Sequence, residues 1–328
     1  MKKPDFSSKP VVPVLVGPTA SGKTSLSIRL AKTLHGEIVS ADSMQIYQKM
    51  DVGTAKPTEK EKRGIAHHLI DCVPPDQSFS VADYKEKALA AIQDILDRRR
   101  LPIVVGGTGL YINALTQKWG FPEIKTDPEV RKRLEAEYDS HTPEEMHAKL
   151  RRIDPNAAEK IHPHNKKRVL RALEVYETTG RTKTYWENQV RQIDLPYTYV
   201  LMGIRMPRSR LYERINERVD VMIQSGLVEE VASLLAQGYD PSLVSMQALG
   251  YKEMIPYLEG TSTLEEQIRI LKRDTRHFAK RQLTWFRKNP DIHWFDVDEA
   301  ADIDDVTERM IKLINAYQRG EQNGTECH

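Results

Sequence analysis

The chain has 328 residues, enough for two lobes or for one domain with a large insertion. Its net charge is only +2, so overall charge gives no reason to expect nucleic acid as a partner. No run approaches the ~20 apolar residues that a membrane span needs, which argues against a membrane protein. The two cysteines, Cys72 and Cys327, indicate neither a zinc motif nor a disulfide framework. We therefore expect a cytoplasmic protein in a reducing compartment.

Short apolar runs alternate with helical patterns over the first 122 residues. The spacing predicts strands at residues 11–16, 37–41, 68–73 and 101–105, and helices at residues 23–34, 81–100 and from 110 onward. Apolar runs of this length are typical of buried parallel strands. The alternation predicts an α/β fold with a doubly wound parallel sheet.

The pattern changes after residue 122, where strand patterns become rare and helical segments are separated by prolines. Strands are expected again at residues 197–204 and 292–295, and helices at residues 209–225, 227–237, 264–288 and up to about 318. We therefore predict a core of residues 1–122 and 197–328 with a helical C-terminal part. A helical insertion of residues 123–196 interrupts this core.

A glycine-rich loop follows the first expected strand and precedes a helix. Gly17, Gly22, Lys23 and Thr24 match the pattern of phosphate-binding loops at each of its fixed positions. Backbone N–H groups and the helix N-terminus attract an anion, Lys23 adds a charge, and the Thr24 hydroxyl is a candidate ligand for Mg²⁺. Taken alone, the loop favours ATP. The other members of this predicted diphosphate- or nucleotide-binding loop are Pro18, Thr19, Ala20 and Ser21.

Polar residues follow two other expected strands. Asp42 and Ser43 come after the second strand, and Thr108 follows two glycines after the strand at 101–105. Open α/β sheets bind ligands at the carboxyl ends of their strands, so Asp42 is a candidate general base or metal-site residue. The alternatives are a helix or turn cap for Asp42 and Ser43, and a simple glycine turn for Thr108.

Three segments carry a local excess of positive charge: residues 160–191, 205–218 and 269–288. The last of them also contains Phe278, Trp285 and Phe286. Basic residues interleaved with aromatic ones fit contact with an RNA backbone and stacking on unpaired bases. Charged helices are more often simply solvated, but three such segments beside a phosphate site favour RNA.

Seven segments in this order resemble bacterial tRNA dimethylallyltransferases. They are GPTASGKT at 17–24, DSMQ at 42–45, DVGTAKP at 51–57, VGGTGLY at 105–111, RALE at 171–174, GY at 250–251 and KRQLTWFR at 280–287. They extend over about 270 residues and are specific as a set. The resemblance implies a P-loop α/β core with a helical insertion that grips the anticodon stem-loop. It also implies that this core is the catalytic one.

The resemblance further implies a reaction. A dimethylallyl group would pass from dimethylallyl diphosphate to N6 of adenosine 37, in tRNAs that read codons beginning with U, and diphosphate would leave. Asp42 matches the family's base, and the glycine loop with Lys23 and Mg²⁺ would hold the diphosphate. Thr108 would contact the adenine or bridge to the diphosphate, and Arg218 would neutralise charge on the leaving group. The adenine must leave its stack to react.

The family match also indicates partners. We expect a monomer that binds tRNA and dimethylallyl diphosphate. The candidate tRNA contacts are Asp42, Ser43, Met44, Gln45, Thr108, Arg131, Lys167, Arg168, Arg171, Gln247, Gly250, Tyr251, Lys252, Lys280, Arg281, Gln282, Thr284, Trp285 and Arg287.

Three other functions share some of these features. A P-loop small-molecule or nucleotide kinase has the same loop and fold class, but leaves Asp42, Thr108 and the basic C-terminal run unexplained. A non-catalytic RNA-binding protein would bind RNA without forming a product. A relative that prenylates free AMP or ATP would have no use for the long insertion and the basic segments.

Overall fold

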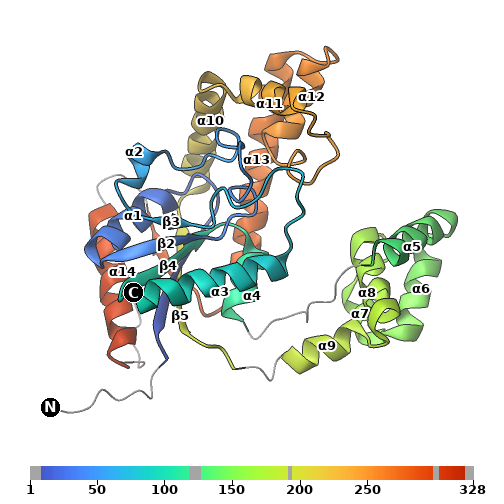
Figure 1. Cartoon of the computed structure of the whole chain (residues 1–328), viewed down its shortest axis with the longest axis horizontal. Helices are drawn as coiled ribbons and strands as arrows, with labels where there is room; N and C mark the ends of the chain where they lie inside the picture. Colours follow the sequence, from blue (N-terminus) through green and yellow to red (C-terminus); the bar gives the residue numbers. More distant parts are fainter. Residues whose placement is uncertain (1–8, 118–126, 191–193, 298–302, 322–328) are drawn as a thin grey trace. The chain divides into compact units, whose positions relative to one another are not determined.

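The computed structural model describes residues 9–117, 127–190, 194–297 and 303–321. The chain divides into two compact units: Met1–Ile112 with Pro196–His328, and Asn113–Leu195. Within the described residues, the first unit contains a single sheet of six strands (Figure 1). The second unit consists of helices alone over its described residues.

All pairings in the sheet are parallel. The strand order is β3 (His67–His68), β2 (Gly36–Ser40), β4 (Leu101–Gly106), β1 (Val11–Val16), β5 (Thr198–Arg205) and β6 (His293–Asp296). In the centre of the sheet, Val14 pairs with Val104 on one side and with Leu201 on the other. Because the strands are parallel, the loops after β1, β2 and β4 meet at one edge, where such sheets bind ligands.

Helices cover both faces of the sheet, which confirms the predicted doubly wound α/β fold. Helices α1 (Lys23–Thr33) and α14 (Ile303–Gln318) pack side by side on one face (Figure 1), against residues such as Leu15, Ile103 and Met202. Alternate residues such as Val14 and Val104 are also fully buried, because they face the other side. Helix α3 (Val81–Asp97) packs there against β2 and β4.

A second hydrophobic cluster lies among the later helices of the first unit. It joins the segment from Ile46 to Met50 with α10 (Arg208–Gln224), α11 (Leu227–Ala236), α12 (Tyr251–Leu258) and α13 (Leu264–Phe286). Two short helices, α2 (Glu59–Lys62) and α4 (Gly109–Thr116), complete the helices around the strand-end loops. This cluster therefore ties the loop after β2 to the helices that carry the basic segments.

The second unit is built from α5 (Pro128–Ser140), α6 (Pro143–Ile153), α7 (Pro155–Lys160), α8 (Lys166–Thr179) and α9 (Lys183–Val190). Three of these helices begin with proline, whose fixed φ suits the first turn and whose missing N–H costs nothing there. The side chains of Asp127, Thr142 and Asp154 cap them. A core around Leu134, Leu150 and Leu173 holds α5, α6 and α8 together, with α7 packed against them.

Two details of the sequence-based prediction were wrong. The strand expected at residues 68–73 is only two residues long, and a single bridge pairs Tyr47 with Val73. The chain turns there because Leu69 and Asp71 adopt φ values of +62° and +56° in the left-handed region. Helix α12 was also missed, since it is short and contains Pro256 in its interior.

Candidate active site

The glycine loop lies between the carboxyl end of β1 and the first turn of α1. Gly22 precedes the helix with φ +90°, which a residue with a Cβ rarely adopts. The ammonium of Lys23 donates to the carbonyls of Gly17 and Pro18 at 2.9 and 2.7 Å. Burial lowers the pKa of Lys23 to about 7, although the nearby Asp42 carboxylate opposes this shift. The buried Ser21 hydroxyl has no partner within the described structure, so it is available to a ligand oxygen.

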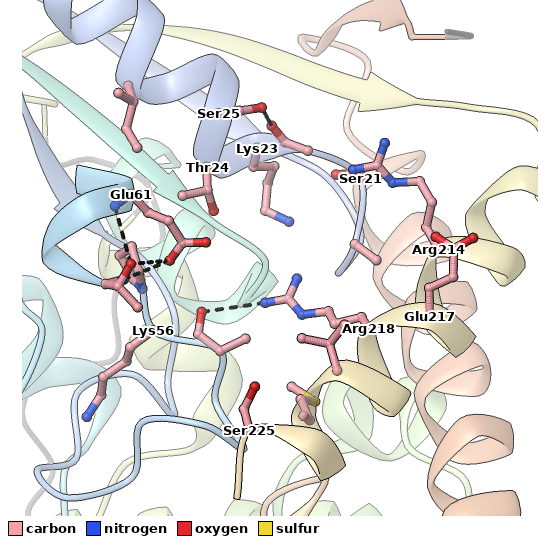
Figure 2. Close-up of a pocket in the computed structure, with 18 of the residues that line it drawn as sticks. Ser21, Lys23, Thr24, Ser25, Lys56, Glu61, Arg214, Glu217, Arg218 and Ser225 are labelled. Carbon is pink, nitrogen blue, oxygen red and sulfur yellow. Dashed lines mark hydrogen bonds between the residues drawn. The ribbon is translucent and has the colours of Figure 1, made fainter. Parts of the chain in front are cut away.

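A cavity of about 800 Å³ opens beside this loop. Figure 2 shows Lys23 and Thr24 pointing into it from the start of α1, and Arg218 from α10. Its walls are strongly cationic, and they include three carboxylates, those of Asp51, Glu61 and Glu217. Arg29, Lys56 and Arg210 pair with carboxylates, but the basic residues still outnumber the carboxylates of the lining, so the cavity suits a polyanion. The basic residues that line it are Lys23, Arg29, Lys56, Arg63, Arg210, Arg214 and Arg218.

Arg218 is the predicted site residue on α10. One of its Nη atoms donates a long hydrogen bond of 3.5 Å to the carbonyl of Ala55 (Figure 2). Burial lowers the pKa of Arg218, and the Asp42 carboxylate opposes that shift. One turn earlier, Arg214 lines the same cavity close to Gly22. Arg214 was missed from the sequence, although its spacing of four residues from Arg218 on one helix face could have identified it.

The loops after β2 and β4 are joined by side chains. The Thr108 hydroxyl accepts a hydrogen bond from the Ser43 N–H at 3.0 Å and donates to the Ser43 hydroxyl at 3.3 Å. The Asp42 carboxylate accepts from the N–H of Met44 at 2.9 Å, and within the described part of the chain its other oxygen accepts from no protein donor. Asp42 is close enough to influence the pKa of both Lys23 and Arg218. The structure thus brings Asp42, Thr108, Lys23 and Arg218 into one neighbourhood.

Gln282 on α13 connects two of these loops. Its side-chain oxygen accepts from the Thr19 N–H at 2.8 Å, and its amide donates to the Gly107 carbonyl at 3.0 Å. Gln282 is buried, and a Cβ on Gly107 would stand only 2.3 Å from its nitrogen. A Cβ on Gly109 would likewise stand 2.3 Å from the Trp285 ring. The glycines after β4 therefore allow α13 to approach the site.

The predicted tRNA contacts in the first unit differ in exposure. On α13 and its C-cap, five side chains are open to solvent: Lys280, Arg281, Thr284, Trp285 and Arg287. Gln247 and Lys252 are exposed as well. By contrast, Gly250 and Tyr251 are buried, and Tyr251 donates to Glu230 at 2.6 Å. The side chains of Tyr251 and Gln282 both form hydrogen bonds inside the protein. Their contact with tRNA stays a prediction.

In the second unit, Lys167 and Arg168 are exposed near the start of α8. Arg131 and Arg171 are half-buried and lie beside the fully buried carboxylate of Glu174, at 3.6 and 3.2 Å. Arg131 also pairs with Glu135 at 2.7 Å. The carboxylates hold these two guanidinium groups in place on neighbouring helices, and contact of either group with tRNA stays a prediction.

Thr24 is the predicted ligand for Mg²⁺, and its hydroxyl lies at the exposed start of α1 on the cavity wall. Across the described part of the chain, no group of three or more His, Cys, Asp or Glu side chains is arranged to hold a metal ion. Because Mg²⁺ prefers six oxygen ligands and keeps several waters, the residues present fit it where phosphate oxygens supply part of its shell.

Comparison with known proteins identifies the family. The IPP transferase family model matches residues 45–289 of this chain. The chain belongs to the IPP transferase family. It is 52% identical to a tRNA dimethylallyltransferase of Acetivibrio thermocellus over 304 residues, which cover 93% of this chain and 96% of that one. A tRNA dimethylallyltransferase of Alkaliphilus oremlandii is 51% identical over 304 residues, covering 93% of this chain and 97% of the relative.

Solved structures of related enzymes share the fold. The tRNA isopentenylpyrophosphate transferase of Bacillus halodurans is 44% identical and superposes with a TM-score of 0.70, over 96% of this chain and 100% of that chain. A eukaryotic dimethylallyltransferase acting on tRNA is 28% identical with a TM-score of 0.82, over 97% of this chain and 81% of that chain. These matches confirm the predicted family and fold class, and they do not favour the kinase alternative.

None of the helices in the described segments is long and apolar enough to cross a membrane.

Proposed function

We propose that this family member transfers a dimethylallyl group from dimethylallyl diphosphate to N6 of adenosine 37 in tRNAs that read codons beginning with U. The observation that carries the proposal is the grouping of Asp42, Lys23 and Arg218 beside a cationic cavity and a glycine loop. A carboxylate next to a cationic cavity suits a reaction in which an amine attacks and a diphosphate leaves.

In this mechanism the exocyclic N6 attacks C1 of the dimethylallyl group. The new N–C bond forms as the C1–O bond breaks, and the diphosphate takes the bonding electron pair. Asp42 accepts the proton that N6 loses, through the carboxylate oxygen that Met44 does not occupy. Thr108, bonded to Ser43 at the edge of the adjoining strand-end loop, fixes the position of the loop that carries this base.

The cationic groups act on the leaving diphosphate. Lys23, Arg218 and the backbone N–H groups of the glycine loop stabilise the negative charge that grows as the C1–O bond breaks. The Ser21 and Thr24 hydroxyls add hydrogen-bond donors at the same anion. Thr24 would help to hold Mg²⁺ here, and the ion would supply further charge neutralisation.

The tRNA would be held by two sets of residues. In the first unit these are the exposed residues Lys280, Arg281, Thr284, Trp285 and Arg287, whose charges suit the backbone and whose aromatic ring suits base stacking. In the helical unit they are Arg131, Lys167, Arg168 and Arg171. In this proposal the enzyme acts as a monomer, and it works in the cytoplasm because its substrate is tRNA.

The test combines purified protein, dimethylallyl diphosphate, Mg²⁺ and an unmodified tRNA that carries adenosines 36 and 37. The expected product is N6-dimethylallyladenosine in the tRNA, detected by mass spectrometry after nuclease digestion. Reactions with free AMP or ATP as acceptor run in parallel. A product on AMP or ATP but not on tRNA would reject tRNA as the substrate, and phosphoryl transfer from ATP instead would support a kinase.

A further inference from the structure

The loop from Asp51 to Ala55 forms a wall of the cavity. One carboxylate holds it, from a helix that is distant in sequence but in contact with the loop. One oxygen of Glu230, in the first turn of α11, accepts from the N–H groups of Asp51 and Val52, both at 2.8 Å. The other oxygen accepts from the Gly53 N–H at 3.1 Å. Three successive backbone N–H groups thus converge on a single carboxylate, an arrangement that binds anions strongly.

Tyr251 completes this contact. Its hydroxyl donates to Glu230 at 2.6 Å, and its ring is fully buried against the loop. A Cβ on Gly53 would stand 2.4 Å from that ring, so the loop lies directly on Tyr251. Burial and the adjoining Glu230 carboxylate raise the pKa of Tyr251 well above its ordinary value, so its hydroxyl remains a donor. Both oxygens of Glu230 are therefore fully engaged.

At its Ala55 end, the 51–55 loop contacts two side chains of the candidate active site. The carbonyl of Ala55 accepts from Arg218 at 3.5 Å and from the Gln45 side chain at 3.4 Å. Ala55 itself has φ +48°, an unfavourable conformation for a residue with a side chain. The surrounding contacts must maintain that conformation, and the last of the Glu230 hydrogen bonds, at Gly53, lies only two residues earlier.

We infer that Glu230 is a positioning residue for diphosphate binding: it fixes the 51–55 loop, and through the Ala55 carbonyl it sets the orientation of the Arg218 guanidinium. This inference rests on the proposed function, because that proposal assigns Arg218 to the leaving group. Glu230 does not touch the substrate. Its effect reaches Arg218 through the Ala55 carbonyl, which accepts from the guanidinium. Lys56, another cation of the cavity wall, also contacts the loop, because its ammonium donates to the Asp51 carboxylate at 2.7 Å.

A purely structural role for Glu230 makes a different prediction. Acidic side chains in the first turn of a helix stabilise the helix. Glu229 lies next to Glu230 in the first turn of α11, but its side chain is exposed. If Glu230 only stabilised α11, its loss would lower the free energy of unfolding by the same amount whether or not Arg218 is present. Glu229→Gln is therefore the matched control, since it removes the same charge from the same turn.

The experiment is a double-mutant cycle on the affinity for inorganic diphosphate, measured by calorimetry on the full chain with Glu230→Gln, Arg218→Gln and the double variant. Four groups donate to Glu230: three backbone N–H groups of the loop and the Tyr251 hydroxyl. A glutamine has only one acceptor oxygen, and its NH₂ group would face two of these donors, which therefore lose their acceptor. We expect Glu230→Gln to weaken diphosphate binding about tenfold in the wild-type background and less than about twofold when Arg218 is already glutamine. Glu229→Gln should change neither value.

An equal loss in both backgrounds would overturn the inference, because Glu230 would then act independently of Arg218. If Glu230→Gln does not fold, as judged by thermal unfolding, Tyr251→Phe takes its place in the cycle with an expected loss of about threefold. Because the probe is inorganic diphosphate, the result does not depend on tRNA. If Glu230 and Arg218 are coupled in diphosphate binding but the protein does not prenylate tRNA, this inference holds and the proposed function is contradicted. If the protein prenylates tRNA but the two residues are not coupled, the proposed function holds and this inference is contradicted.

Discussion

Binding of diphosphate should be accompanied by uptake of a proton at Lys23. In the ligand-free protein, burial holds the pKa of this lysine at about 7, so at pH 8 about nine in ten molecules carry a neutral amine. An anion that arrives about 4 Å away adds roughly 4 kcal/mol of attraction at an effective dielectric constant near 20. That corresponds to about three pKa units, which would move the pKa of Lys23 to about 10 in the complex.

The sign of the pH dependence follows. Below pH 7 the lysine is already charged in the free protein, so its titration does not alter affinity. Between pH 7 and about 10 each bound diphosphate must bring a proton, and affinity falls by up to tenfold per pH unit. The expected uptake through Lys23 is about 0.9 proton at pH 8 and about 0.5 at pH 7.

Titration calorimetry with inorganic diphosphate, in buffers of different ionisation enthalpy, measures this uptake. Lys23→Arg is the matched variant, because arginine keeps its charge throughout this pH range and leaves only the proton exchange of the ligand itself. The difference between the two proteins should be about 0.9 proton at pH 8. Equal uptake by both proteins would show that Lys23 is already charged in the free site, and would refute the reasoning.

Three further changes test other parts of the site. Asp42→Asn should lower kcat for tRNA prenylation at least about 100-fold and change the Kd for tRNA less than about twofold, because it removes the proton acceptor but keeps a side chain of the same size; equal losses in kcat and binding would argue against its role as base. Gly107→Ala should lower the free energy of unfolding in urea by about 1–3 kcal/mol, because its Cβ would collide with Gln282 at 2.3 Å; an unchanged midpoint would show that Gln282 moves freely. Arg287→Glu should weaken tRNA binding and reduce the salt slope of the binding constant by about one, and an unchanged slope would mean that this side chain is merely solvated.

Local patterns in the sequence were sufficient for much of the fold and for the glycine loop. The loop could be predicted because its glycines, lysine and hydroxyl are adjacent in sequence and its flanking strand and helix have distinct periodicities. The prediction of a strand at 68–73 was wrong for a local reason that composition does not reveal. Leu69 and Asp71 adopt positive φ values and bend the backbone, although neither is glycine or asparagine.

Long-range contacts could not be predicted in this way. Gln282 bonds to Thr19 across 263 positions of sequence, and Glu230 bonds to the 51–53 loop across 177 to 179 positions. Periodicity indicates which face of a helix is buried, but not which polar side chain meets which backbone group. For the same reason the sequence does not reveal that Tyr251, which stays a predicted tRNA contact, packs inside the protein against Gly53 and Glu230.

The most direct test of the central claim is to locate the modified nucleoside. Purified protein is incubated with dimethylallyl diphosphate, Mg²⁺ and two transcripts of one tRNA, one with adenosine and one with guanosine at position 37, and the nuclease fragments are weighed. The account predicts one dimethylallyl group in the fragment that contains adenosine 37 and none in the guanosine transcript. Modification of another nucleotide, or the absence of a dimethylallyl group from both transcripts, would contradict it.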